Sequence, residues 1–412
     1  MQLKRVVITG VGVVSPFGSG VDVLMNGIEQ GRSAVRHMDG WDQYIGLRSH
    51  VGAPAEIKDE KKIPRQQRRS MGRMSIFAAQ AAEQAVADSG IHLRGEQGEV
   101  SSWDVGCIIG STMGSAKSIN DAFEMILPKK DITQLGSAMF FQCMSHTAAV
   151  NVAQYLGLNG YIMATSAACA SAVQAIGAGY DLIRLGKQEV LLCGGAEELH
   201  PTVTGSFDVL FATSVKYNQT PQKTPRPFDR DRDGLVCGEG SGILVLEEYE
   251  RAVSRNARIY AEVIGYSSNG NGFHVSQSDK EPMVHCMREA IKDAGIKPEE
   301  IDYINAHATA TLQGDKEEAG AIKELFGDSI PVSSLKGYIG HTLGASGAIE
   351  LIASLIMMEK GLIYPTLNLD NVDPDCQGIN HVTKPVKKKV DVILKNCFAF
   401  GGINTALVCR KI

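Results

Sequence analysis

One cysteine stands where a reactive thiol would be useful. Cys169 lies in TSAACASAVQAIGAGYDLIR (165–184), among alanines and serines and directly before a helical pattern. A free cysteine is most often a small apolar residue in a packed core. Beside the positive end of a helix it can instead be a nucleophile, because that end favours the thiolate. The residues that flank it are too small to cover the sulfur, which favours an accessible nucleophile: Ala167, Ala168, Ala170 and Ser171.

Other reactive side chains stand at the ends of apolar runs. His307 ends the run IDYINAH, and His341 lies in SSLKGYIGHTLGASG, five residues after Lys336. Phe400 stands beside a glycine pair in NCFAFGGIN. In α/β proteins the loops at the carboxyl ends of strands carry the chemistry. A thiol, two imidazoles, a lysine and a glycine turn in such loops form a specific constellation, although each signal alone is weak.

These groups fit carbon–carbon bond formation on thioesters. A cysteine thiolate can take up an acyl group as a thioester. Two neutral imidazoles that donate N–H groups can stabilise an enolate oxygen as a carboxylate leaves as carbon dioxide. Backbone amides at Cys169 and in the Phe400 turn would form an oxyanion hole, in which each donor is typically worth roughly 3–4 kcal/mol. Lys336 would help to keep the histidines unprotonated, because like charge disfavours a second cation.

The elements that would position these residues occur twice along the chain. The repeat comprises helices at 75–91 and 283–296, apolar strands at 105–115 and 301–311, and helices at 169–185 and 344–361. The first helix of each set ends in D-[SA]-G-I, whose glycine is a typical helix stop. Strands that alternate with helices favour a parallel sheet covered on both faces. We predict a duplicated α/β fold in which Cys169 and His341 precede corresponding helices; chance similarity of two α/β halves is the alternative.

The C-terminal VILKNCFAFGGINTALVCRK predicts two strands around a glycine turn, which is a hairpin.

No linker interrupts the chain. We therefore predict one compact body with two related halves, in which residues 1–255 carry the nucleophilic cysteine and residues 256–412 carry the two histidines.

Bulk composition excludes several classes of protein. A formal charge of -5 and a pI near 6.1 argue against a general nucleic-acid binder. The sequence has no apolar run long enough for a membrane span, and its start lacks the apolar core of a secretory signal. Nine cysteines without a CxxC pair favour a reducing compartment over a disulfide framework or a zinc site. We expect a cytoplasmic protein that needs no metal and no cofactor.

At this point the motifs show a family resemblance. TSAACASA, NAHATAT, SSLKGYIGHTLGASGA and NCFAFGGIN resemble the β-ketoacyl-acyl-carrier-protein synthases, members of the thiolase fold, and the similarity spans essentially the whole chain. Segments such as DRDRDGLVCGEGSG are most similar to the synthase I and II branches. The resemblance implies a thiolase-like, duplicated α-β-α-β-α layered fold and a homodimer. It also implies acyl transfer to a cysteine, followed by decarboxylative Claisen condensation with malonyl-carrier protein in fatty-acid chain elongation.

The resemblance implies a role for each matching residue. Cys169 would accept the acyl group, and His307 and His341 would support decarboxylation and condensation. Lys336 would hold the charge pattern around His341. The implied substrate-binding and gating residues are Thr309, Thr311, Glu318, Phe400 and Gly401, with the Phe400 amide in the oxyanion hole. A segment that lines the acyl tunnel across the family's dimer matches Met139, Phe140 and Phe141, although a purely structural interface role fits these residues equally well.

The family's acyl carrier protein is a small acidic partner. A basic cluster is usually only a solvated face, but KKIPRQQRRSMGR matches the family's docking region. The implied docking residues are Lys61, Lys62, Arg65, Arg68, Arg69 and Arg73. Weaker candidates for the same surface are Arg48, Lys129 and Lys130.

The sequence also departs from the family pattern. The departures that we expect to affect gating are Ala308, Ala310, Ala399 and Ile403. Alanine in place of glycine restricts the backbone, so we expect a stiffer gate. Together with the bulky residues 139–141, these changes hint at an unusual acyl chain, such as a polyene or polyketide intermediate.

Three alternatives to an elongating synthase remain open. The first is a specialised ketosynthase of a polyene or polyketide pathway. The second is a non-catalytic partner subunit, against which the presence of Cys169 argues, because such partners lack the nucleophile. The third is a degradative thiolase, which would need a second cysteine in a glycine-flanked context; neither Cys397 nor Cys409 has one.

Overall fold

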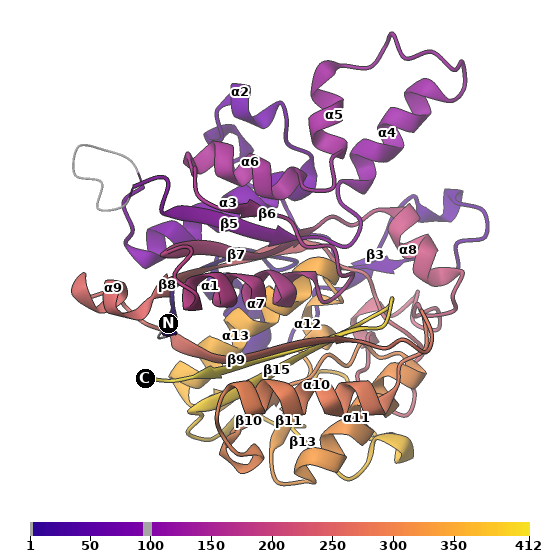
Figure 1. Ribbon diagram of the computed structural model, residues 1–412. Coiled ribbons are helices and arrows are strands. Elements are labelled where there is room, and N and C mark those ends of the chain that lie inside the picture. The colour runs from indigo at the N-terminus through magenta and orange to yellow at the C-terminus, as the bar shows by residue number, and fades with distance from the viewer. Residues whose placement is uncertain (1–2, 94–100) are drawn as a thin grey trace.

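A long mixed β-sheet runs through the molecule (Figure 1). The computed structural model describes residues 3–93 and 101–412. Within these residues the sheet has twelve strands, in the order β13-β11-β10-β15-β16-β9-β1-β8-β7-β5-β6, with β2 added beside β1. Its strands are β1 (Val6–Ser15), β2 (Gly18–Ser19), β5 (Val105–Gly110), β6 (Ile162–Met163), β7 (Val190–Glu197), β8 (Gly240–Glu248), β9 (Ala261–Gly270), β10 (Tyr303–Asn305), β11 (Pro331–Ser333), β13 (Asn380–His381), β15 (Val392–Ala399) and β16 (Ile403–Arg410). Two small ribbons pair β3 (Arg36–His37) with β4 (Val51–Gly52) and β12 (Leu362–Ile363) with β14 (Val386–Lys387).

The strand order and orientation repeat in the two halves of the sheet. In the first half β1, β8 and β7 are antiparallel neighbours, and β5 and β6 continue in parallel with β7. In the second half β9, β16 and β15 are antiparallel neighbours, and β10 and β11 continue in parallel with β15. A short antiparallel pairing of β1 with β9 joins the halves. The repeated strand order and orientation confirm the predicted duplication.

Helices form three layers around the two halves of the sheet. The helices are α1 (Val21–Glu29), α2 (Arg65–Arg68), α3 (Arg73–Ser89), α4 (Ala116–Ile126), α5 (Ser137–Cys143), α6 (Thr147–Leu156), α7 (Ser171–Arg184), α8 (Pro201–Asp208), α9 (Tyr249–Ser254), α10 (Lys280–Asp293), α11 (Leu312–Phe326), α12 (Lys336–Ile339) and α13 (Ser346–Lys360). In Figure 1, α3 and α6 cover one outer face, α10 and α11 cover the other, and α7 and α13 lie between the halves of the sheet. The predicted α-β-α-β-α layering is therefore confirmed. None of the helices in the described segments is long and apolar enough to cross a membrane.

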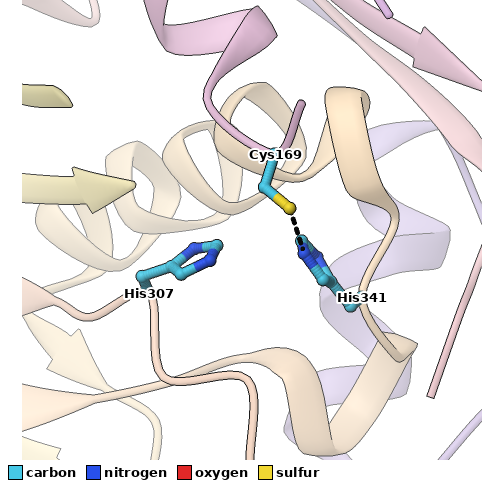
Figure 2. Close-up of side chains that lie close together, drawn as sticks. All are labelled: Cys169, His307 and His341. Carbon is cyan, nitrogen blue, oxygen red and sulfur yellow. Dashed lines mark hydrogen bonds between the residues drawn. The ribbon is translucent and has the colours of Figure 1, made fainter. Parts of the chain in front are cut away.

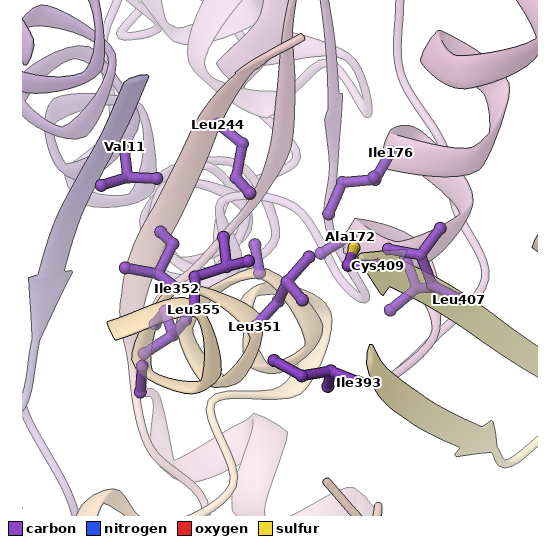
Figure 3. Close-up of a cluster of buried hydrophobic side chains, with 14 of the residues drawn as sticks. Val11, Ala172, Ile176, Leu244, Leu351, Ile352, Leu355, Ile393, Leu407 and Cys409 are labelled. Carbon is purple, nitrogen blue, oxygen red and sulfur yellow. The ribbon is translucent and has the colours of Figure 1, made fainter. Parts of the chain in front are cut away.

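The central helices form the main hydrophobic core. On α7 the apolar residues Val173, Ile176, Tyr180 and Ile183 are all buried. Helix α13 is buried without interruption from residue 346 to residue 358, because the sheet and α7 surround it. Figure 3 shows side chains of both halves packed around these two helices. The core therefore fixes the starts of α7 and α13, next to which Cys169 and His341 lie.

Glycine allows the outer helices to approach the sheet closely. A Cβ atom on Gly12 of β1 would lie 2.0 Å from the carbonyl oxygen of Ala81 on α3, and one on Gly10 would lie 2.3 Å from that of Ala85. A side chain at either position would push α3 off the sheet. Helix α3 then ends at Gly90, whose φ of 68° is a left-handed stop, as the sequence predicts.

The C-terminal hairpin is confirmed, whereas one strand is shorter than predicted. Strands β15 and β16 pair antiparallel around residues 400–402. The predicted strand at 301–311 is β10, which covers only Tyr303–Asn305. Beyond it the backbone N–H groups of His307 and Ala308 donate to the carboxylate of Glu318 and no longer to a neighbouring strand.

Candidate active site

Cys169 lies in a tight turn between β6 and α7. Ala168 has a φ of 48°, a left-handed conformation that costs a non-glycine residue roughly 1–2 kcal/mol. The hydroxyl of Ser171 holds this turn: it accepts the N–H of Ala167 at 2.9 Å and donates to the carbonyl of Ala168 at 2.7 Å. The helix begins at Ser171, two residues after the cysteine. The turn thus presents the thiol in front of the helix.

The expectation of an accessible thiolate is wrong. The side chain of Cys169 is only 3% exposed, because residues distant in the sequence cover the sulfur that the small neighbours leave free. Burial is the main cause that raises the pKa of the thiol above its ordinary value, and the nearby Cys397 adds to this. The cation of Lys336 acts in the opposite direction but does not prevail. Near neutral pH the side chain of Cys169 is therefore a protonated thiol.

Two histidines of the second half face this thiol (Figure 2). The Nε2 atom of His341 lies 2.9 Å from the Sγ atom of Cys169. The backbone of His341 is fixed on both sides, since its N–H donates to Val236 at 2.7 Å and its carbonyl accepts from Gly238 at 2.8 Å. The ring of His307 lies 5.3 Å from that of His341, centroid to centroid, at 81°. The predicted meeting of cysteine and histidines is seen in the structure.

Glu318 places His307 by holding its backbone. Its carboxylate, on α11, accepts the N–H of His307 at 2.8 Å and that of Ala308 at 2.6 Å. The side chain of Asn396 donates to the same carboxylate at 3.2 Å. Because α11 is anchored in the core, these bonds fix where the loop after β10 turns toward the thiol.

A buried chain of charges lies behind the histidines. The Nζ atom of Lys336 lies 2.7 Å from one oxygen of Glu350, and that of Lys395 lies 2.5 Å from the other. All three side chains are fully buried. Burial lowers the pKa of both His307 and His341 well below its ordinary value, and the charge of Lys336 lowers each further. Both imidazoles are therefore neutral near pH 7. Sequence reasoning missed Glu350 and Lys395, which lie inside an apolar helix and strand.

A cavity of about 240 Å³ opens onto this cluster. Its lining includes most of the predicted site residues: Cys169, His307, Thr309, Thr311, Glu318, His341 and Phe400. The hydroxyls of Thr309 and Thr311 lie 3.1 Å apart. Gly401 is not part of the lining, and its N–H donates to the carbonyl of Val275 at 2.7 Å.

The turn after β15 brings Phe400 to the cavity. Gly401 and Gly402 adopt φ values of 88° and 74°, so these two residues take the left-handed positions of the turn. Ala399 ends β15 in an extended conformation, which any residue can adopt, so alanine causes no backbone strain at this position. The ring of Phe400 packs against Phe207 at 5.9 Å between centroids.

The loop after His307 contains a left-handed alanine. Ala310 has a φ of 69°, and its N–H donates to Asp315 at 3.0 Å. Ala308 lies fully inside the fold, with its carbonyl accepting from Ser334. How these alanines and Ile403 affect gating stays a prediction.

The proposed acyl-pocket residues do not reach this cavity within one chain. Met139, Phe140 and Phe141 lie on α5, which projects with α4 from the body of the molecule (Figure 1). Phe140 and Phe141 are 68% and 48% exposed.

The basic cluster is mostly at the surface. Lys61 and Lys62 end a short 3₁₀ turn, Arg65 and Arg68 belong to α2, and Arg69 follows it. Acidic neighbours partly neutralise it, since Lys62 pairs with Asp59 at 2.9 Å and Arg68 with Glu60 at 3.9 Å.

Two of the arginines proposed for docking make fixed internal contacts. Arg73 pairs with the buried Glu239 at 2.6 Å, while its side chain stays 31% exposed, so its part in docking stays a prediction. Arg48 pairs with the buried Asp208 at 3.1 Å, while its side chain stays partly exposed. Lys129 and Lys130 are exposed between α4 and α5.

Cys397 is a further residue that sequence reasoning missed. Its thiol, on β15, donates to the backbone oxygen of Cys169 at 2.9 Å and lies 3.5 Å from Nδ1 of His307. The sequence showed only that it is not flanked by glycines, so its place beside Cys169 was not predictable.

The central cluster also has the donor set of a metal site. One ligand atom each of Cys169, His307 and His341 lies within 4.8 Å of the other two. A thiolate and two imidazoles suit a soft divalent ion. The same groups have the chemistry of a nucleophile with two neutral acid–base partners, and the surrounding cavity and buried lysines favour this role over metal binding.

Comparison with known proteins shows the family of this chain. The family model "Beta-ketoacyl synthase, N-terminal domain" matches residues 3–252, and "Beta-ketoacyl synthase, C-terminal domain" matches residues 260–370. The chain is 36% identical over 411 residues to 3-oxoacyl-[acyl-carrier-protein] synthase 1 of Escherichia coli (strain K12), with 100% of both chains covered.

Solved structures give the same answer. A beta-ketoacyl synthase from Burkholderia phymatum STM815 superimposes with a TM-score of 0.95 at 43% identity, covering 99% of this chain and 100% of that one. A type II PKS acyl-carrier protein in complex with its ketosynthase bound to the hexaketide matches with a TM-score of 0.91 at 32% identity, covering 100% of each chain. The chain belongs to the β-ketoacyl synthase family.

Proposed function

We propose that the protein is a 3-oxoacyl-acyl-carrier-protein synthase that elongates acyl chains. The observation that carries this proposal is the position of the Cys169 thiol. Its sulfur lies 2.9 Å from Nε2 of His341, and both residues line one cavity together with His307. The curated relatives, which carry this name and align over the full chain, support it.

The first step transfers an acyl group to Cys169. The sulfur attacks the thioester carbon of an acyl-carrier protein, the bond to the pantetheine sulfur breaks, and the cysteine proton ends on that sulfur. Because the resting thiol is protonated, its proton leaves as the attack proceeds, and Nε2 of His341 is the acceptor already in contact. Backbone amides of Cys169 and Phe400 stabilise the tetrahedral oxyanion. Their shared place in the cavity lining supports this role.

The second step condenses malonyl-carrier protein with the bound acyl group. The malonyl carboxylate leaves as carbon dioxide, its bonding electrons form an enolate, and the enolate carbon attacks the Cys169 thioester. The cysteine sulfur leaves as a thiolate and takes up a proton from solvent. His307 and His341 act on the malonyl thioester in this step, and their neutral state supports that role because a charged imidazole could not accept a hydrogen bond. Thr309 and Thr311 contact the pantetheine arm.

The decisive experiment measures the mass of the intact protein after incubation with acyl-carrier proteins and then with malonyl-carrier protein. Wild type should gain one acyl group, lose it on malonyl addition and release the elongated β-keto product. A Cys169→Ala variant should gain none, whereas Cys409→Ala, which removes another buried thiol, should behave as wild type. Failure of wild type to become acylated by any chain would overturn the proposal and revive the partner-subunit alternative.

The same panel of acyl chains tests a specialised ketosynthase. The likeness to a ketosynthase bound to a hexaketide favours this second candidate, as do the alanines beside His307. Extension of only conjugated or polyketide chains would support it. Extension of saturated chains would support fatty-acid elongation.

The proposed assembly is a homodimer. Strand β6 ends the sheet, so its outer edge can pair with a second copy. Exposed large apolar side chains gather on the neighbouring α4–α5 projection: Phe123, Met125, Leu127, Ile132, Phe140 and Phe141. A second copy would cover them and bring Met139, Phe140 and Phe141 to the acyl tunnel. Light scattering should give twice the chain mass for wild type and a lower mass for Phe140→Asp; a wild-type monomer would contradict the proposal.

The carrier protein docks on the basic cluster of Lys61, Lys62, Arg65, Arg68 and Arg69. Four of these five side chains are exposed and Arg68 is half-buried, and a positive surface complements an acidic partner, which supports this docking site. Charge reversal at Arg65 should weaken binding and reduce its salt dependence, whereas reversal at the distant exposed Lys187 should not. Equal effects of the two variants would contradict the docking site.

Two further assignments complete the proposal. The chain divides into related halves at residues 1–255 and 256–412, which the repeated strand order supports. The protein works in the cytoplasm, which its nine free thiols support, because a reducing compartment keeps thiols unpaired.

A further inference from the structure

A second thiol lies behind the catalytic pair and has no role in the steps above. Cys397 is fully buried on β15 and does not line the catalytic cavity. Its sulfur lies 2.9 Å from the backbone oxygen of Cys169 and 3.5 Å from Nδ1 of His307. One side chain thus contacts both the turn that holds the nucleophile and the ring of a neighbouring histidine.

The single proton of this thiol fixes the direction of both contacts. A backbone carbonyl can only accept, so the S–H group of Cys397 donates to the oxygen of Cys169. Burial raises the pKa of this thiol to about 11, so the proton stays on the sulfur at neutral pH. Once that proton is committed, the sulfur can only accept from His307. The hydrogen of the neutral ring then lies on Nδ1, and Nε2 carries a lone pair.

We infer that Cys397 is a positioning residue that holds His307 in the tautomer with a protonated Nδ1 and an unprotonated Nε2. The ring lines the cavity and points toward Cys169 and His341 (Figure 2). His307 therefore accepts a proton or a hydrogen bond from a group in the cavity and cannot donate one to a thioester oxygen. Once Cys169 is acylated it no longer donates to Nε2 of His341, so donation falls to that nitrogen and to the backbone amides. The two histidines thus have different tasks, where sequence analysis gave both the same one.

The meaning of this tautomer for catalysis rests on the proposed function, but the tautomer itself does not. It is measured on protein labelled with ¹⁵N in the imidazole rings, without substrate, with the His307 signals assigned from a His307→Gln variant. In wild type Nδ1 of His307 should be protonated and Nε2 bare. Cys397→Ala should mix or reverse the two states, because it removes the partner of Nδ1. A protonated Nε2 in wild type, or no change in Cys397→Ala, would overturn the inference.

Two matched variants separate positioning from packing. Cys397→Ser keeps one donor and one acceptor, so it should preserve the wild-type tautomer. Cys409→Ala removes an equally buried thiol of the same hairpin that touches neither Cys169 nor His307, and it should also leave the tautomer unchanged. If Cys409→Ala disturbs His307 as much as Cys397→Ala does, the effect is general packing and the inference is wrong.

Kinetics give a second readout. Malonyl-carrier decarboxylation by Cys397→Ala should fall about ten- to a hundredfold, the usual range for a lost buried hydrogen-bond partner, while Cys397→Ser stays near wild type. Equal losses in both variants would show that sulfur volume matters and not the hydrogen bonds. If wild type decarboxylates no malonyl thioester, the proposed function fails, and the tautomer measurement still decides the role of Cys397.

Discussion

Replacing Glu350 by glutamine removes the negative charge between two buried lysines. The carboxylate lies 2.7 Å from Lys336 and 2.5 Å from Lys395, and no part of the three side chains is exposed. In Glu350→Gln both cations remain in the interior without a counter-charge. Breaking a buried ion pair by removing one partner typically costs about 3–5 kcal/mol, because the remaining charge stays desolvated.

This cost can be converted into a melting temperature. Unfolding entropy is about 2.1 cal/mol/K per residue, so a chain of 412 residues has roughly 0.9 kcal/mol/K at its midpoint. The expected fall in Tm for Glu350→Gln is therefore about 3–6 °C. Glu359, on the same helix, pairs with Arg258 at 2.6 Å, but both side chains are half exposed. Such surface pairs are worth about 0–1 kcal/mol, so Glu359→Gln should lower Tm by about 1 °C or less.

Differential scanning calorimetry on both variants, at low and high salt, tests the calculation. The effect of Glu350→Gln should not depend on salt, because the site is closed to ions. Adding Lys395→Met should restore part of the stability, since one of the two stranded cations is removed. If Glu350→Gln melts together with Glu359→Gln, the buried charges are not energetically coupled as their geometry indicates.

Four more outcomes follow from the structure. Because the pKa values of His307 and His341 lie well below 6.5, the rate of condensation should not decline with a midpoint near pH 6.5, and a pH–rate profile that does so would contradict neutral imidazoles. The unfolded chain binds these two protons below about pH 6.5 and the folded chain does not, so Tm should fall as the pH is lowered through that range. Gly12→Ala should destabilise by about 2 kcal/mol or more in chemical denaturation, because its Cβ would meet the backbone of α3 at 2.0 Å, whereas Gly136→Ala, with open space around it, should be neutral within about 0.5 kcal/mol. Alkylation of Cys169 by iodoacetamide should keep accelerating above pH 9, since burial raises the pKa of this thiol; a plateau below that pH would refute it.

Much of the fold was predictable because it depends on local patterns. The helix stop at Gly90 and the apolar face of α7 follow from spacing along the chain. The hairpin around residues 400–402 follows from its glycines and alternating strands. The lengths of β10 and β5 were not predictable, because a side chain from a distant helix, such as Glu318, ends the backbone pairing of β10.

The sequence by itself determined which reactive groups exist and that they stand at the ends of repeated elements. It identified Cys169, His307 and His341 as candidates, because a nucleophile and its partners must be particular residue types. Only the tertiary structure decided the environment of these groups. The thiol is buried and protonated because residues of the other half cover it, and Glu350, Lys395 and Cys397 act on the site although their surroundings in the sequence look like ordinary core. Desolvation and hydrogen bonding depend on neighbours in space, which the order of residues along the chain does not show.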